Sequence, residues 1–481
     1  MYGYRSDHSF RTKSDLPFLP IEEAARLVRA RRVSPVDLVE ATLDRIDAHD
    51  DGVRAFSYVD DEGALAAAEE CERAIMAGGA FGPLCGIPIA VKDIVDVAGL
   101  PTTAGSRILA GNVAREDAAI VARLRAAGAV IIGKTNTHEF AYGVISAPTR
   151  NPWDLARIPG GSSGGSAAAL AAGMAMGAIG TDTAGSIRLP SALCGVAGLK
   201  PTYDLVERHG VIPLSWSLDH AGPMARTAAD VALLLAAMAP EVGARVRGKG
   251  RAKDMQGRAD AVLAQLERPV TGLRVGVPRP YFYDDLDPEV EAAVAQALRA
   301  LGHLGMKECQ VALPDVALTF AVGRAVQRPE ASAYHQKTLR ATPELYEDET
   351  RRDLELGALY LATDYLQGQR VRAQLRERWL AVMQEVDLLV MPTVPVAAPP
   401  APAEGAGGSG VVKGTLLRNT YPFNLAGFPA LSVPCGFTSA GLPIGLQIVG
   451  RPHEDLTVLR VGHYYQQASA WHAKRPPLKA L

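Results

Sequence analysis

The chain contains few features that would tie it to a metal, a redox partner or a membrane. Its five cysteines are far apart and include no Cys-x-x-Cys pair of the kind that binds zinc or exchanges electrons. No run of about 20 apolar residues is present, and residues 1–18 have no apolar stretch of the kind found in signal peptides. We therefore expect a cytoplasmic protein with reduced cysteines, no metal, no cofactor and no membrane partner.

A strong net charge is missing as well. The 50 Lys and Arg side chains nearly balance the 52 Asp and Glu side chains, and the formal net charge is -2 at pH 7. No large field exists to attract nucleic acid or an anionic membrane. Aromatic residues reach only 6%, whereas hydrophobic residues reach 48%, which is typical of a globular core filled by Ala, Val and Leu. A small, neutral molecule is the partner that this balance favours.

Helix and strand patterns alternate along the chain. Apolar residues recur at helical spacing from Ile21 to Ala77, and Ser34 before Pro35 is typical of a helix start. Short apolar runs predict strands at 86–91, 129–133, 273–278, 387–391, 430–434 and 443–449. Helical patterns fill 117–128, 287–302 and 315–385, and a last helix begins at Asp455. This order predicts an α/β fold, a single large domain with a mixed, mostly parallel sheet covered by helices on both faces.

The same patterns suggest how the chain is divided. Residues 1–75 form a helical lead-in, and residues 76–481 form the main domain, with a helical covering subregion at about 280–385. The polar, Arg- and Lys-rich residues 240–270 predict an exposed connector. The Pro- and Gly-rich segment 392–410 predicts a mobile loop.

Two clusters of glycine and serine stand out between residues 159 and 202. They read GGSSGG at 160–165 and TDTAGS at 181–186, and each leads into a predicted helix. Backbone amides in such a loop can approach a phosphate or an oxyanion closely. A P-loop would need Gly-Lys-Ser/Thr and a dinucleotide loop would need G-x-G-x-x-G after a strand, and neither is present. An oxyanion site is favoured, with a purely structural pair of turns as the alternative.

A lysine marks the end of the first buried strand. Lys92 follows the apolar run GIPIAV directly. A charged side chain is unusual at the mouth of a buried strand, because burial disfavours its charged form. Together with the two glycine clusters, this lysine favours a catalytic site over two structural turns.

These segments resemble the amidase signature family. GGSSGGSAAALAAG and GTDTAGSIRLPSALCGVAGLKPT look like the family's signature, and CGIPIAVKDIVDVAGLPTTAGS looks like its lysine segment. The similarity continues through GKTNTHEF, SLDHAGPMART, DLLVMPT, NLAGFPALSVPCG and GLPIGLQIVGRP. It covers nearly the whole chain. The resemblance implies the amidase signature fold and a cofactor-free amidase that hydrolyses amide C-N bonds.

The resemblance also assigns roles to single residues. It implies that Lys92 is the catalytic base, Ser162 the bridging serine after a cis peptide bond from Gly161, and Ser186 the nucleophile. An uncharged Lys92 would take a proton from Ser162, which would take one from Ser186. The amides that would hold the oxyanion belong to Thr183, Ala184, Gly185 and Ser186.

Several nearby residues do not fit a catalytic role. His138, His209 and His220 could suggest a Ser-His-Asp triad, but the sequence contains no G-x-S-x-G elbow. Asp182 and Arg188 flank Ser186 and are expected to pair and fix its loop. Cys194 has no base placed for it, so we expect a buried structural residue.

Departures from relatives bear on the substrate. Most relatives have glycine where this chain has Ala184. The glutaminase subunit of tRNA-dependent amidotransferases, a branch of the family, carries acidic or polar readers of glutamine at places that hold His138, 144–147 and Leu417 here. This favours a free-standing amidase with a less polar substrate over a glutaminase-type subunit.

The resemblance also implies a substrate pocket. We expect contributions from Phe140, Ala141, Tyr142, Gly161 and Trp216, and the aromatic members favour an aryl or hydrophobic group. Carbamates present the same carbonyl next to nitrogen, so a carbamate (urethane) stays open beside an amide. Relatives are often dimers, and a homodimer stays open as well.

Overall fold

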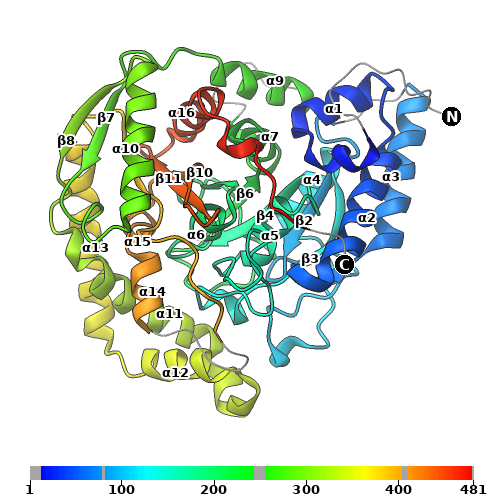
Figure 1. Ribbon diagram of the computed structural model, residues 1–481. Coiled ribbons are helices and arrows are strands. Elements are labelled where there is room, and N and C mark those ends of the chain that lie inside the picture. Colours follow the sequence, from blue (N-terminus) through cyan, green and yellow to red (C-terminus); the bar gives the residue numbers. More distant parts are fainter. Residues whose placement is uncertain (1–11, 79–81, 243–254, 403–409, 479–481) are drawn as a thin grey trace.

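The computed structural model describes residues 12–78, 82–242, 255–402 and 410–478. An 11-stranded sheet crosses the molecule in the order β1-β3-β2-β4-β6-β5-β10-β11-β9-β7-β8 (Figure 1). The strands are β1 (Phe56–Val59), β2 (Pro88–Lys92), β3 (Val130–Thr135), β4 (Gly177–Asp182), β5 (Ala197–Lys200), β6 (His220–Ala225), β7 (Arg274–Pro278), β8 (Lys307–Val311), β9 (Leu388–Pro392), β10 (Ala430–Phe437) and β11 (Pro443–Val449).

The sheet is mixed, as predicted, but the expectation that it is mostly parallel is wrong. Strand β2 runs parallel to β3 and β4, and β7 runs parallel to β8 and β9. The other neighbouring strands are antiparallel. The short turn between β10 and β11 explains part of the difference, because a turn of this length can join only antiparallel neighbours.

Helices cover both faces of the sheet. Helices α7, α10 and α16 pack on β6, β9 and β10, while α5 and α6 pack together on β2, β4 and β11. The helices are α1 (Ile21–Arg29), α2 (Pro35–Val53), α3 (Asp61–Met76), α4 (Ala119–Ala126), α5 (Gly164–Ala171), α6 (Arg188–Cys194), α7 (Ala228–Met238), α9 (Met255–Leu266), α10 (Pro288–His303), α11 (Thr319–Ala341), α12 (Asp348–Gly357), α13 (Ala362–Val382), α14 (Gly410–Leu417), α15 (Tyr421–Ala426) and α16 (Asp455–Gln467). None of the described helices is both long enough and apolar enough to span a membrane.

Local signals in the sequence placed several helices correctly. The Ser34 hydroxyl accepts a hydrogen bond from the Val36 amide at 2.9 Å, and Pro35 opens α2. Asp287 caps α10 in the same way, with Pro288 as its first residue. These caps satisfy amides that have no partner inside the helix.

Three regions differ from expectation. The helical lead-in also contributes β1, which pairs with β3 at one edge of the sheet. The covering subregion contains β8 at the opposite edge. Part of the predicted connector, 243–254, lies outside the described residues, but 255–266 form α9, whose Val262 is buried against the core. Part of the predicted mobile loop, 403–409, also lies outside them.

Small residues bring the loop before α5 close to the sheet. Helix α5 is buried along its whole length. A Cβ atom on Gly165 would lie 2.5 Å from the Ala55 carbonyl oxygen and 2.6 Å from the Asn136 amide nitrogen, so only glycine fits there. This close approach holds the start of α5 against the residue before β1 and the residue after β3.

A separate helical layer lies beyond that loop. Helix α11 contacts both α12 and α13, and α11 and α13 contact α15. Figure 1 shows α11 and α12 below the central strands. Trp379 and Phe423 are fully buried in the cluster that joins this layer to the sheet. The space between the layer and the strand ends contains the candidate site.

Candidate functional site

Lys92 ends strand β2 and is fully buried. Its Nζ atom lies 2.7 Å from the Ser162 Oγ atom and 2.7 Å from the Thr181 Oγ1 atom. Strands β2 and β4 are parallel neighbours, so their carboxyl ends lie at the same edge of the sheet. The topology therefore brings Lys92 and Thr181 together from positions far apart in the sequence.

The serine-rich loop is held in place from both sides. The peptide bond between Gly161 and Ser162 is cis, as the family resemblance implied. The Ser146 hydroxyl donates to the Ser162 carbonyl oxygen at 2.8 Å and accepts from the Gly164 amide at 3.0 Å. The Ser163 amide donates to the Ser186 carbonyl oxygen at 3.2 Å. The two serine loops therefore adjoin.

A buried ion pair fixes the loop that carries Ser186. Two nitrogens of Arg188 donate to the Asp182 carboxylate at 2.9 Å each, which confirms the expected pair, and both side chains are fully buried. The Asn424 amide adds a bond to the same carboxylate at 2.8 Å. Burial alone would raise the pKa of Asp182, but Arg188 holds the pKa well below its ordinary value.

Gly185 gives this loop its shape. Its φ angle is +146°, a conformation that residues with a side chain rarely adopt, and an added Cβ atom would lie 2.2 Å from the Thr420 Oγ1 atom. That hydroxyl donates to the Ala184 carbonyl oxygen at 2.7 Å. Within the described residues, no group accepts a hydrogen bond from the amides of Ala184, Gly185 or Ser186.

The electrostatic surroundings favour an uncharged amine. Burial lowers the pKa of Lys92 to about 7, and the carboxylates of Asp182 and Asp219 oppose a larger fall. Burial also raises the pKa of Asp219 to about 6, against hydrogen bonds from the Thr183 hydroxyl at 2.6 Å and from two backbone amides. Lys92 therefore titrates near neutral pH, where a base is most useful.

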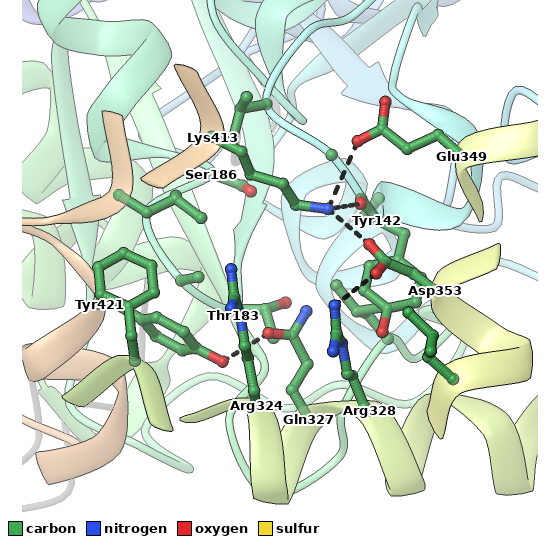
Figure 2. A pocket seen from close by; sticks show the side chains of 18 of the residues that line it. Tyr142, Thr183, Ser186, Arg324, Gln327, Arg328, Glu349, Asp353, Lys413 and Tyr421 are labelled. Carbon is green, nitrogen blue, oxygen red and sulfur yellow. Dashed lines mark hydrogen bonds and ion pairs between the residues drawn. The ribbon is translucent and has the colours of Figure 1, made fainter. Parts of the chain in front are cut away.

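A cavity of about 450 Å³ opens in front of Ser186. Its inner wall includes Thr183, Ala184 and Ser186, and α11, α12 and α14 supply its outer wall (Figure 2). The outer wall is polar and charged, with contributions from Arg324, Gln327, Arg328, Glu349, Arg352, Asp353 and Lys413.

A second cavity of about 230 Å³ lies next to the first and shares Ala141, Thr183 and Leu214 with it. Most of its wall is apolar, from Ile94, Val211, Ile212, Pro213, Leu214 and Trp216. Thr181, Asp219 and His220 also line it. The two cavities therefore meet beside the residues that surround Lys92.

The predicted pocket residues fall in different places. Ala141 lines both cavities, Tyr142 lines the first and Trp216 lines the second. Phe140 lines neither, because its ring packs against His335, with ring centroids 4.3 Å apart. Gly161 also lines neither cavity, and a Cβ atom there would lie 2.7 Å from the Val144 carbonyl carbon.

Some residues of the site went unpredicted. Thr181 contacts Lys92 and Asp219 contacts Thr183 through tertiary packing, and their spacing in the sequence gives no sign of it. Helices α11 and α12 of the outer wall were predicted only as part of a covering subregion, and helix α14 was not predicted. His220 lines the second cavity, and its Nδ1 atom lies 2.7 Å from the Leu218 carbonyl oxygen. No group of His, Cys, Asp and Glu among the described residues is arranged to hold a metal ion.

Comparisons with known proteins agree with this geometry. The family model described as Amidase matches residues 37–459. The chain is 43% identical to "Amidase" of Pseudomonas putida over 97% of this chain and 99% of that protein. It is 40% identical to a glutamyl-tRNA(Gln) amidotransferase subunit of Chloroflexus aggregans (strain MD-66 / DSM 9485), with the same shares covered.

Among solved structures, one described as "Crystal structure of amidase" superposes with a TM-score of 0.83 at 34% identity. The alignment covers 93% of this chain and 99% of that one. The similarity therefore extends over the sheet, both helical faces and the outer helical layer.

Proposed function

The chain belongs to the amidase family, and from that premise we propose that it hydrolyses a carboxylic amide through an acyl-enzyme on Ser186. The observation that carries the proposal is the environment of Lys92. Its buried amine has a pKa lowered to about 7 and lies 2.7 Å from the Ser162 hydroxyl. An uncharged amine in that position can accept the proton that Ser162 passes on.

In the proposed first half of the reaction, Ser162 gives its proton to Lys92 and takes one from Ser186. The Ser186 oxygen attacks the carbonyl carbon of the amide. Amides of the loop 183–186 stabilise the negative charge on the carbonyl oxygen, and a donor of this kind is worth about 3 to 4 kcal/mol in other hydrolases. The proton held by Lys92 returns through Ser162 to the leaving nitrogen, and the C-N bond breaks.

In the second half, water replaces the amine. The same relay takes a proton from water, the resulting hydroxide attacks the acyl carbon, and Ser186 leaves with a proton returned through Ser162. One amide and one water molecule give one carboxylic acid and one amine. The chain needs no cofactor for any of these steps.

The second cavity supports a substrate with an aryl or hydrophobic group. Its wall is mostly apolar and includes Trp216, whose side chain is half exposed at the rim. Burial of an aromatic ring in such a cavity contributes favourably to binding. A carbamate presents the same carbonyl to Ser186, so an aryl carbamate fits this proposal equally.

A glutaminase-type component of a tRNA-dependent amidotransferase is the alternative, because a glutamyl-tRNA(Gln) amidotransferase subunit is 40% identical over nearly the whole chain. The cavity argues against it at one place. Leu417 lines the first cavity where that branch carries an acidic reader of the glutamine ammonium. Copurification with a second subunit, together with glutaminase activity that appears only in its presence, would favour the alternative.

A hydrolysis screen tests the proposal. We expect wild-type chain to release 4-nitroaniline from at least one acyl 4-nitroanilide or aryl carbamate, and Ser186→Ala to release none. Ser439→Ala, at an exposed turn that lines neither cavity, is the matched control and keeps full activity. Equal rates for wild type and Ser186→Ala would contradict the proposal.

A further inference from the structure

The outer wall of the first cavity carries more positive than negative charge. Four basic side chains line it, Arg324, Arg328, Arg352 and Lys413, against two carboxylates, Glu349 and Asp353. Figure 2 shows Arg324 and Arg328 rising from α11 into the cavity, with Lys413 opposite them. The wall faces the same space as Ser186, so its charge acts on whatever occupies that space.

Two of the four positive charges are balanced by the two carboxylates within a compact network. Lys413 lies 2.9 Å from an Asp353 oxygen and 3.6 Å from a Glu349 oxygen, and Arg328 donates to Asp353 at 2.7 Å. Burial alone would raise the pKa of Asp353, but Lys413 and Arg328 hold it below its ordinary value. Asp353 is therefore ionised, and both carboxylates of the cavity already have a basic partner.

Arg324 and Arg352 remain outside this network. Within the described residues, neither guanidinium has a carboxylate within ion-pair distance. The Arg324 guanidinium lies 5.9 Å from the centre of the Phe320 ring, which leaves its hydrogen-bond donors unused by that contact. The cavity therefore holds two positive charges that the described part of the protein does not balance.

We propose that the first cavity binds a carboxylate of the substrate through Arg324, with Arg352 as a second positive charge. This inference rests on the proposed amide hydrolysis and names its substrate class. The planar guanidinium can donate two parallel hydrogen bonds to a carboxylate, which a neutral amide or ester cannot match. The substrate is an amide that carries an anionic group on the side of the first cavity.

The same wall argues against an ammonium next to that carboxylate. The apolar side chain of Leu417 lines this cavity, and Glu349 and Asp353 are already paired with Lys413 and Arg328. An added ammonium would meet uncompensated Arg324 and an apolar side chain. The preferred substrate is an amide of a simple dicarboxylic acid and not an amide of an α-amino acid.

Three 4-nitroanilides form a matched test series. Glutaryl 4-nitroanilide carries the carboxylate, its methyl ester removes the charge, and γ-glutamyl 4-nitroanilide adds an α-ammonium. Calorimetric binding to Ser186→Ala reports on the anion site without turnover. We expect the glutaryl compound to bind about tenfold or more tightly than its methyl ester and than the γ-glutamyl compound.

A substitution tests whether Arg324 causes the preference for the carboxylate. Arg324→Gln in the Ser186→Ala background should remove most of the tenfold preference for the carboxylate, while Arg324→Lys keeps part of it. Arg299→Gln, an exposed arginine on α10 that lines neither cavity, is the matched control and leaves the preference unchanged. Thermal unfolding of each variant confirms that the fold is intact, and Arg352→Gln provides a second variant if Arg324→Gln does not fold.

The outcomes separate the two proposals. Equal binding of the carboxylates and their esters, or no binding of either, overturns the anion site, and so does a preference that survives both Arg324→Gln and Arg352→Gln. Tighter binding of the γ-glutamyl compound overturns the exclusion of the ammonium. Hydrolysis of neutral anilides by wild-type chain would still support the amidase reaction in each of these cases, whereas absence of all hydrolysis would count against that reaction alone.

Discussion

The Lys92 side chain combines a cost in stability with a chemical use. Its pKa is about 7 in the folded chain against an ordinary value of 10.5. Between these two values the unfolded chain binds more protons than the folded chain, so this group makes the protein more stable as pH rises through that window. The folded state is least favoured at the pH where Lys92 is charged, which is also where it cannot act as a base.

The first prediction concerns the pH dependence of hydrolysis. If Lys92 is the base, kcat/KM rises with pH through about 7 and then levels, because only the uncharged amine accepts a proton. Lys92→Ala should abolish hydrolysis, so the rise of kcat/KM with pH should disappear as well. Initial rates between pH 5 and 9 with a chromogenic anilide measure this, and a flat profile in wild type would argue against Lys92.

The second prediction concerns Asp219. Its carboxylate raises the pKa of Lys92, and it is ionised above its own pKa of about 6. Asp219→Asn removes that charge, so we expect the acidic limb of kcat/KM to move to lower pH. The same variant loses one acceptor for the Thr183 hydroxyl and should also lower kcat. If kcat falls but the pH at which kcat/KM rises does not change, Asp219 has a structural role alone.

Single residues of the site differed in how well the sequence predicted them. Lys92, Ser162 and Ser186 stand in long motifs, and the structure brings Lys92 and Ser162 into contact. Thr181 stands in the same motif, yet its contact with Lys92 depends on the pairing of β2 with β4. Phe140 was expected in the pocket because of its neighbours, but its φ angle of +47° turns the chain and its ring packs against His335.

At the scale of elements, the loop between β4 and α6 depends on glycine. Gly185 has a positive φ angle and no room for a Cβ atom next to Thr420. The third prediction is that Gly185→Ala lowers the free energy of unfolding by about 1 to 3 kcal/mol and abolishes hydrolysis, because the loop must shift. Urea unfolding and anilide hydrolysis measure the two effects.

A matched substitution separates the effect of backbone strain at Gly185 from the general effect of replacing a glycine with alanine. Gly302 lies in the last turn of α10, where an added Cβ atom would meet nothing within 4 Å. Gly302→Ala should be neutral or stabilising by about 0.5 kcal/mol, because alanine restricts the unfolded chain. If both substitutions change the free energy of unfolding and the rate of hydrolysis equally, the loop around Gly185 does not require glycine.

Elements were predicted best where a local signal exists. Caps such as Ser34 and Asp287 satisfy amides of their own helix, so the sequence alone is enough to identify them. Strand β8 has an exposed, polar pattern, with Lys307 and Glu308 at its start, and its place at the sheet edge comes from pairing with β7. Such an edge strand carries no apolar signal of its own.

At the scale of the whole molecule, the N-terminal residues are joined to the sheet. Strand β1 pairs with β3, and Arg226 next to β6 donates to the carbonyl oxygens of Pro17 and Leu19 at 2.6 and 2.9 Å. Leu38 of α2 belongs to the same core cluster as Ile89 of β2. We propose that residues 1–75 are a lead-in that the main domain, 76–481, needs for stability.

The fourth prediction tests that boundary. A chain of residues 76–481 should lose the cooperative thermal transition of the full chain, because apolar residues of the core and the edge strand β3 would be exposed to water. Calorimetry and circular dichroism of both chains measure this. A truncated chain that unfolds cooperatively at the same temperature would mean that the lead-in is an independent unit.

Whether neighbouring strands are parallel or antiparallel also depends on the packing of the whole molecule. The sequence therefore predicted the strand directions only in part. Alternation of helices and strands favours parallel pairing, and it predicted β2, β3 and β4 correctly. Strands β5, β6, β10 and β11 follow one another in the sheet through turns and long excursions that place them antiparallel. The order of those strands depends on packing of segments more than 200 residues apart.

The most direct test is the identity of the residue that acts as the nucleophile. Wild-type chain treated with a fluorophosphonate probe should gain the mass of a single adduct, and peptide mass spectrometry should place it on Ser186. Ser186→Ala should gain none, and Lys92→Ala should react far more slowly. An adduct on any other residue, or no adduct in a wild-type chain that hydrolyses anilides, would contradict the account.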